Sequence, residues 1–206
     1  MGGAQKYVLD LAEYMRRDNK YSVMVATGSF NGDLFEKFEQ EKIPLVKLKY
    51  LKRDINPLWD IFALFELISF LKKEKPDIVH LNSTKISILG SLAAKIAGIK
   101  TVIYTAHGWV FNEALSPLKK KLYSFAEKLT APLKTAIIVL SKKDAELATT
   151  YGIMPKKKLV IIPNGIDVHL EVFPKKKAII ELSRITRCPS LFSAHFIIGT
   201  TANFYK

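Results

Sequence analysis

The feature that most constrains this chain is a repeated alternation of short apolar runs with longer helical patterns. Three apolar runs end in polar residues: DIVHLNS at 77–83, TVIYTAHGW at 101–109 and LVIIPNGID at 159–167. Strands separated by helices of this length predict right-handed crossovers and a mainly parallel sheet. Open sheets of this kind bind ligands at the carboxyl ends of their strands. The polar residues therefore predict a site along one edge of the sheet.

The expected fold class is α/β, with a mainly parallel sheet and helices on both faces. Apolar, β-branched runs predict strands at 21–27, 43–48, 78–81, 101–105, 136–140 and 159–162, and helical patterns occupy 58–73, 85–97, 117–129, 142–151 and 176–187. Ser141 is the expected N-cap of the helix at 142–151 and Gly152 its expected end, while Gly98 is the expected end of the helix at 85–97. Helix 58–73 has only a narrow polar stripe, through Asp60, Glu66 and Ser69, so we expect it to be buried around most of its girth.

Composition narrows the class of protein. The 206 residues are 49% hydrophobic, which is enough for one domain with a real core and the start of another. A single cysteine, Cys188, excludes an internal disulfide framework and a cysteine-rich zinc site, and fits a cytoplasmic protein. The longest apolar stretch, 58–71, contains two carboxylates and falls short of the ~20 residues that span a bilayer, so no transmembrane helix is predicted.

Charge indicates an anionic partner. The net charge is +13, from 32 basic and 19 acidic residues, which favours a phosphate-bearing substrate, an anionic membrane surface or nucleic acid over a cationic ligand. A plain solvated surface is the other interpretation. Lys119 to Lys121, with Lys128 downstream, form either a basic patch facing a membrane or phosphate, or a solvated helix face. No aromatic-basic binding signature is present, so nucleic acid is not an expected partner.

Two strand tips carry the best chemical candidates. His107 and Gly108 follow one strand, where the imidazole can hydrogen-bond a substrate hydroxyl or act as an acid or base near neutral pH. His80 and Asn82 lie at the end of another. The alternative for each histidine is a structural role, with its hydrogen bonds satisfied inside the protein.

Two weaker candidates involve backbone turns. Gly2 and Gly3 precede an amphipathic helix, whose N-terminal N–H groups and dipole can bind a phosphate. The alternative is a terminal stretch without a binding role. Asn164 follows the last strand in an Asn-Gly pair, which is typical of a simple turn as well as of a ligand contact.

In order and spacing, the segments at 2–12, 75–109, 137–148 and 160–167 resemble the N-terminal domain of family 4 glycosyltransferases. The resemblance covers nearly all of residues 2–167. It implies the GT-B fold, in which two Rossmann-like domains face each other across the active site. The expected fold class is therefore the N-terminal, Rossmann-like half of that fold.

The resemblance also implies an activity, namely retaining transfer of a sugar from a nucleotide-sugar donor to a polysaccharide or lipid-linked saccharide, with neither a metal ion nor a cofactor. Gly2 and Gly3 would contact the donor diphosphate, and His107 would lie by the transferred sugar as the catalytic residue. His80, Asn82, Gly108 and Asn164 are the expected substrate-binding candidates. Asn82 stands where many relatives carry a second histidine, so that contact is expected to differ.

We expect three regions along the chain. Residues 1–167 form the N-terminal domain without its first strand, 168–194 a helical linker, and 195–206 the first strand of a shortened donor-binding domain. The expected protein is the acceptor-side half of a cytoplasmic enzyme, inactive alone and in peripheral contact with the inner face of the membrane through its basic surface. The alternative is a non-catalytic module that binds phosphorylated or lipid-linked ligands, or a subunit that pairs with a separate donor domain.

Overall fold

The computed structural model of the chain describes residues 3–28, 33–112, 115–153, 158–165 and 172–188. The chain divides into two units, Met1–Asn164 and Gly165–Lys206. The expected strand at 195–206 lies outside the described residues. Within the second unit, α7 (Lys175–Thr186) agrees with the helix predicted at 176–187.

All the described strands are parallel to their neighbours, as the sequence predicts. They are β1 (Val25–Thr27), β2 (Leu45–Lys47), β3 (Ile78–Leu81), β4 (Thr101–Ala106), β5 (Ala136–Val139) and β6 (Leu159–Ile161). β1 pairs with β2 in one sheet, and a second sheet has the order β3-β4-β5-β6. No strand among the described residues joins β1 to β3. That the domain lacks its first strand stays a prediction of the sequence.

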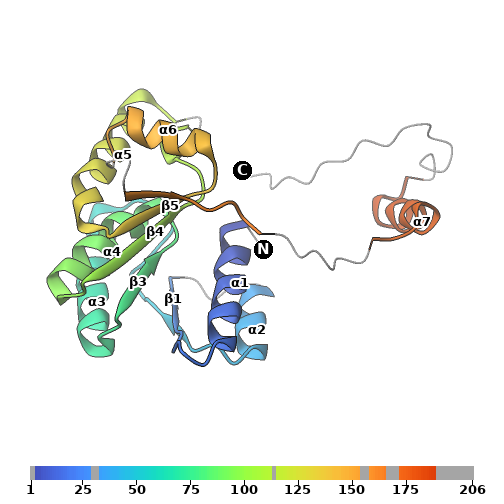
Figure 1. Ribbon diagram of the computed structural model, residues 1–206, viewed down its shortest axis with the longest axis horizontal. Helices are drawn as coiled ribbons and strands as arrows, with labels where there is room; N and C mark the ends of the chain where they lie inside the picture. The colour runs from blue at the N-terminus through green and yellow to red at the C-terminus, as the bar shows by residue number, and fades with distance from the viewer. Residues whose placement is uncertain (1–2, 29–32, 113–114, 154–157, 166–171, 189–206) are drawn as a thin grey trace. The chain divides into compact units, whose positions relative to one another are not determined.

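The helices of the first unit are α1 (Gly3–Arg17), α2 (Asp33–Gln40), α3 (Pro57–Glu74), α4 (Thr84–Ala97), α5 (Pro117–Thr130) and α6 (Lys142–Thr150), with 3-10 turns at Val110–Asn112 and Ala131–Leu133. α4 packs between α3 and α5, and helices lie on both sides of the strands (Figure 1). The fold class predicted from the sequence is thus confirmed.

Capping residues set the helix boundaries much as predicted. The Ser141 Oγ accepts a hydrogen bond from the Asp144 N–H at 3.1 Å and begins α6. Gly98, at φ +81°, ends α4 in a left-handed conformation that strains any residue with a Cβ. These local signals fix where each helix meets its strand.

The core is centred on β4 and β5. Tyr104 and Val102 on β4 are 1% exposed, and Ile137 and Val139 on β5 are fully buried. Such tight burial holds these strands rigidly in the middle of their sheet. The buried strand consequently fixes the position at which the loop after β4 begins.

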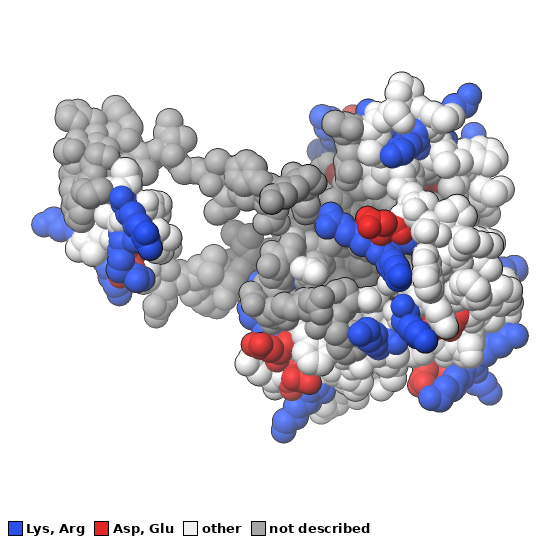
Figure 2. Space-filling view, turned by 180° about the vertical axis from the view of Figure 1, so that it is seen from behind, with Lys and Arg blue, Asp and Glu red and all other residues white. Residues whose placement is uncertain are grey.

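Positive charge is concentrated at the surface. On the face shown in Figure 2, blue Lys and Arg side chains clearly outnumber red Asp and Glu side chains. Lys134 is an exception, because it is 1% exposed and its Nζ lies 3.2 Å from the Glu127 Oε2. The basic composition is thus available to anionic partners.

The expectation that α3 is buried around most of its girth is wrong. Its outward apolar residues, which we call the α3 stripe, are Leu58, Ile61, Phe62 and Phe65, each between 52% and 71% exposed. The polar side chains bind neighbouring parts of the unit instead. Asp60 pairs with Lys85 on α4, and Glu66 accepts the N–H groups of Lys49 and Tyr50 at 2.7 and 2.9 Å. These bonds turn Asp60 and Glu66 toward the rest of the unit and leave an apolar stripe uncovered.

Candidate active site

The predicted strand-tip residues of β3 and β4 come together. The two strands pair in register, with His80 opposite Ile103, and both end at the same edge of the sheet. Just beyond those ends, the His107 Nε2 lies 3.3 Å from the Asn82 Oδ1. Asn82 therefore fixes the position of the imidazole that the sequence identified as the best candidate.

His80 joins the same cluster from within β3. Its Nε2 lies 2.8 Å from the hydroxyl oxygen of Thr105, a fully buried residue of β4. Burial, and to a smaller extent the nearby charge of His107, lower the pKa of His80 to about 4. Burial also lowers the pKa of His107. Both rings are consequently neutral at pH 7, so each offers one donor and one acceptor.

Sequence reasoning missed Tyr7. Its ring on α1 lies edge-on to the His107 ring, with centroids 4.8 Å apart, and 6.4 Å from the His80 ring. Its hydroxyl oxygen is 3.4 Å from that of Thr105. The only signal was a tyrosine on the first turns of a helix whose apolar face begins at Val8. The sequence around Tyr7 does not predict that α1 lies beside the ends of β3 and β4.

The loop after β4 is held by a buried tryptophan. Trp109 is 2% exposed, and its Nε1 donates to the Asp144 carbonyl oxygen at 2.9 Å. Gly108 has φ +107°, and a Cβ there would meet nothing within 4 Å. The glycine is thus needed for its backbone conformation, while the space beside it stays open to a ligand. Together these residues keep His107 at the mouth of the cluster.

Gly3 and Asn164, two other predicted residues that the structure describes, are not joined to this cluster. Gly2 lies outside the described residues, and Gly3 begins α1 with open space around it. Gly3 is four positions before Tyr7, so both lie on one side of α1. Asn164 is exposed, and no hydrogen bond between described residues links it to His107. Their roles stay predictions.

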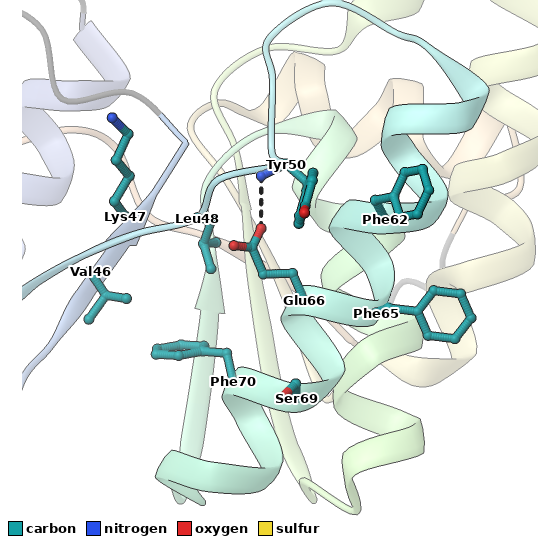
Figure 3. Close-up of a pocket in the computed structure, with 9 residues that line it drawn as sticks. All are labelled: Val46, Lys47, Leu48, Tyr50, Phe62, Phe65, Glu66, Ser69 and Phe70. Atoms are coloured by element: carbon teal, nitrogen blue, oxygen red, sulfur yellow. Dashed lines mark hydrogen bonds between the residues drawn. The ribbon is translucent and has the colours of Figure 1, made fainter.

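A shallow groove of about 470 Å³ lies elsewhere, between β2 and α3. Figure 3 shows Glu66 at its centre, reaching the backbone N–H of Tyr50, with Phe62 and Phe70 on either side. Its lining is mainly apolar and carries none of the predicted site residues. In the ranges that the structure describes, no group of three His, Cys, Asp or Glu side chains could hold a metal ion. Among the described residues, the histidine cluster is thus where the predicted polar site residues come together.

Comparisons with known proteins agree with this fold. The sequence model described as Glycosyltransferase Family 4 matches residues 1–170. A UDP-Gal:alpha-D-GlcNAc-diphosphoundecaprenol alpha-1,3-galactosyltransferase of Escherichia coli is 37% identical over 119 residues, which are 58% of this chain and 31% of that protein. The capsular polysaccharide biosynthesis glycosyltransferase CapM of Staphylococcus aureus is 24% identical over 94% of this chain and 49% of its own length.

Solved structures show the same fold. The crystal structure of Anabaena HepE, in complex with UDP and glucose, has a TM-score of 0.66 at 19% identity and covers 90% of this chain and 47% of that one. The lipopolysaccharide outer core galactosyltransferase WaaB, in its apo form, has a TM-score of 0.63 at 15% identity, covering 85% and 46%.

The fold and the family match together define a Rossmann-like glycosyltransferase domain of the GT-B type. The chain belongs to glycosyltransferase family 4. It spans less than half the length of the two named relatives and of the two named structures.

Proposed function

We propose that this chain is the acceptor-side half of a retaining glycosyltransferase and is inactive alone. The donor is a nucleotide sugar, and the acceptor is a lipid-linked saccharide or a growing polysaccharide. The observation that carries the proposal is the cluster of neutral hydrogen-bonding groups at the carboxyl ends of β3 and β4. It consists of Tyr7, His80, Asn82, Thr105 and His107.

Neutral imidazoles suit the recognition of sugar hydroxyls. The His107 Nε2–H donates to the Asn82 Oδ1, so the other nitrogen of the neutral ring can accept a hydrogen bond from a sugar hydroxyl, whereas an imidazolium can only donate. The 3.3 Å contact with Asn82 orients the His107 ring before a ligand arrives. Such pre-orientation lowers the entropic cost of positioning a reactive sugar.

The same neutrality supports the expected inactivity of the chain alone. Transfer from a nucleotide sugar leaves a diphosphate, whose developing charge must be stabilised in the transition state. The lowered pKa values of His80 and His107 leave those rings uncharged at neutral pH. The cluster therefore suits an acceptor and a sugar better than a departing diphosphate.

Acceptor binding and sugar transfer, measured separately, test the proposal. We expect an undecaprenyl-diphosphate-linked saccharide to bind the chain in an NMR titration without turnover of a UDP-sugar. The His107→Ala variant should bind it up to about tenfold more weakly, because a good hydrogen bond is worth about 1.4 kcal/mol. Tyr14→Phe, on an exposed position of α1, is the matched control.

If the His107→Ala variant binds the acceptor as tightly as the parent chain, the role of His107 in acceptor binding is excluded. Robust turnover by the chain alone would contradict the proposal that it is inactive alone. Adding a donor-binding domain as a second chain should restore transfer. NMR of the product then shows whether its anomeric configuration is the same as that of the donor sugar, as a retaining reaction requires.

A further inference from the structure

α5 carries an uncovered apolar stripe along its length. The residues of this α5 stripe are Leu118, Leu122, Phe125 and Leu129, which are 78%, 65%, 63% and 67% exposed. Their spacing of four, three and four positions places them on one side of the helix. On the opposite side, Glu127 and Thr130 are buried against the rest of the unit. Packing of that side fixes the stripe outward.

Lysines flank the α5 stripe on both sides. Lys121 and Lys128 are seven positions apart and share one flank, while Lys119 lies on the other. All three are exposed, whereas Lys120 is half-buried. Lys121 and Lys128 therefore share a flank beside apolar residues, whereas Lys120 faces away from them.

Exposed carboxylates are absent from α5 and from its neighbour α4. Glu127 is the only acidic residue in the two helices, and it is buried beside Lys134. α4 packs alongside α5 and adds Leu92, 36% exposed, and Ile96, 55% exposed, together with the exposed Lys95. The α3 stripe lies on the next helix of the same layer. On α4 and α5, apolar and cationic groups are thus combined without an exposed negative charge.

We propose that the α5 stripe docks into the interface of an anionic lipid bilayer, with α5 lying in the membrane plane. A helix with an apolar face flanked by lysines binds this environment, because its apolar side chains enter the acyl boundary and its ammonium groups meet anionic headgroups. A protein partner fits less well, since lysine is depleted at protein–protein interfaces. Of the helices in the described ranges, none combines the length and apolar character needed to span a bilayer.

Membrane docking goes beyond the proposed function, because it needs neither donor nor acceptor. It brings the chain to the surface where a lipid-linked acceptor would lie. Vesicle binding can be measured without any sugar, so its failure leaves the proposed transfer untouched, and failure of the transfer leaves the docking untouched.

The test is co-sedimentation of the full 206-residue chain with vesicles of phosphatidylcholine containing about 30% phosphatidylglycerol, compared with phosphatidylcholine alone. We expect binding to the anionic vesicles, and a loss of about tenfold or more in the Leu122→Asp and Phe125→Asp variants. The matched control is Tyr14→Asp, because Tyr14 is 72% exposed on α1, and it should bind like the parent chain.

Charge is tested separately by replacing Lys119, Lys121 and Lys128 with glutamine. At about 1 kcal/mol per lysine near an anionic surface, the triple variant should bind anionic vesicles about a hundredfold more weakly. Far-UV circular dichroism and the unfolding midpoint confirm that each variant is folded.

Three outcomes overturn the proposal. One is undiminished vesicle binding by the stripe variants, and another is an equal loss in Tyr14→Asp. The third is a parent chain that does not bind vesicles but forms a dimer in sedimentation equilibrium. The Phe125→Asp substitution would dissociate that dimer. That last result assigns the stripe to a second copy of the chain.

Discussion

His80 shows how burial sets the charge of the site. Its imidazole lies between the Thr105 hydroxyl, at 2.8 Å, and the edge of the Tyr7 ring, with ring centroids 6.4 Å apart. Desolvation disfavours the charged form of a histidine, and His107 nearby adds to that effect. The folded chain consequently holds His80 neutral in a pH range where the unfolded chain would charge it.

This difference predicts a stability that depends on pH. Above the ordinary pKa of 6.5 the ring is neutral in both states, and His80 has its full stabilising effect. As the pH falls from 6.5 toward the folded value of about 4, only the unfolded chain gains a proton, so the free energy of unfolding should fall. The slope is about 1.4 kcal/mol per pH unit at most.

Urea unfolding of the parent chain and the His80→Gln variant, at about pH 7.5 and about pH 5, measures this effect. The variant should lose part of the acid sensitivity, while the part due to His107 persists. Identical pH slopes in the two proteins would show that His80 is not the titrating group.

A second residue-scale prediction concerns Asn82. An Asn82→Asp variant places a carboxylate 3.3 Å from the His107 Nε2, where it stabilises the imidazolium. The pKa of His107, followed by NMR, should rise by about one unit or more. Asn164→Asp, on an exposed residue without a bond to the cluster, is the control and should leave that pKa unchanged.

At the scale of an element, α5 is anchored by a buried ion pair. The Lys134 Nζ lies 3.2 Å from the Glu127 Oε2 and 2.9 Å from the Thr130 hydroxyl oxygen, and the Ser87 hydroxyl lies 3.0 Å from the same carboxylate oxygen. Burial raises the pKa of Glu127 and lowers that of Lys134, and each charge opposes the effect of burial on the other. The pair therefore depends on both members being present.

A double-mutant cycle checks this dependence. Lys134→Met alone should cost about 3–5 kcal/mol, because it leaves a carboxylate buried without its cation. Glu127→Leu combined with Lys134→Met should cost much less than the sum of the two single changes. Additive losses in urea unfolding would contradict the coupling.

Glu66 plays a comparable part for α3. Its carboxylate accepts the N–H groups of Lys49 and Tyr50, so the chain after β2 is tied to the helix. Glu66→Gln keeps the shape but loses one of the two acceptors and the charge, and should cost about 1–2 kcal/mol in thermal or urea unfolding. Ser69→Ala, one helical turn away on an exposed position, should have almost no effect.

For the whole molecule, the division at Asn164 predicts that the first unit folds alone. α7, the helix of the second unit, has no buried residue, so it has no core of its own among the described residues. A chain ending at Asn164 should therefore keep the unfolding midpoint of the full chain to within a few degrees. Calorimetry on both chains checks this, and a large drop would show that the second unit stabilises the first.

Much of the fold was predictable because its signals are local. Gly98 and Ser141 set helix boundaries through the conformation or hydrogen bonds of a few residues. The strands after which His107 and Asn82 lie were visible as short apolar runs, and parallel pairing brings such tips to one edge. The closeness of His107 to Asn82 thus follows from topology, although their 3.3 Å contact does not.

The sequence by itself determined the α/β class, the family and the histidines of the candidate site, because periodicity, capping and motif order are written along the chain. Only the tertiary structure decided that Tyr7 covers both histidines and that the apolar side of α3 faces outward. Both depend on contacts between residues far apart in the chain, Tyr7 with Thr105 and Glu66 with the segment after β2. A helical pattern states which residues share a side of a helix, but packing between elements decides which side is buried.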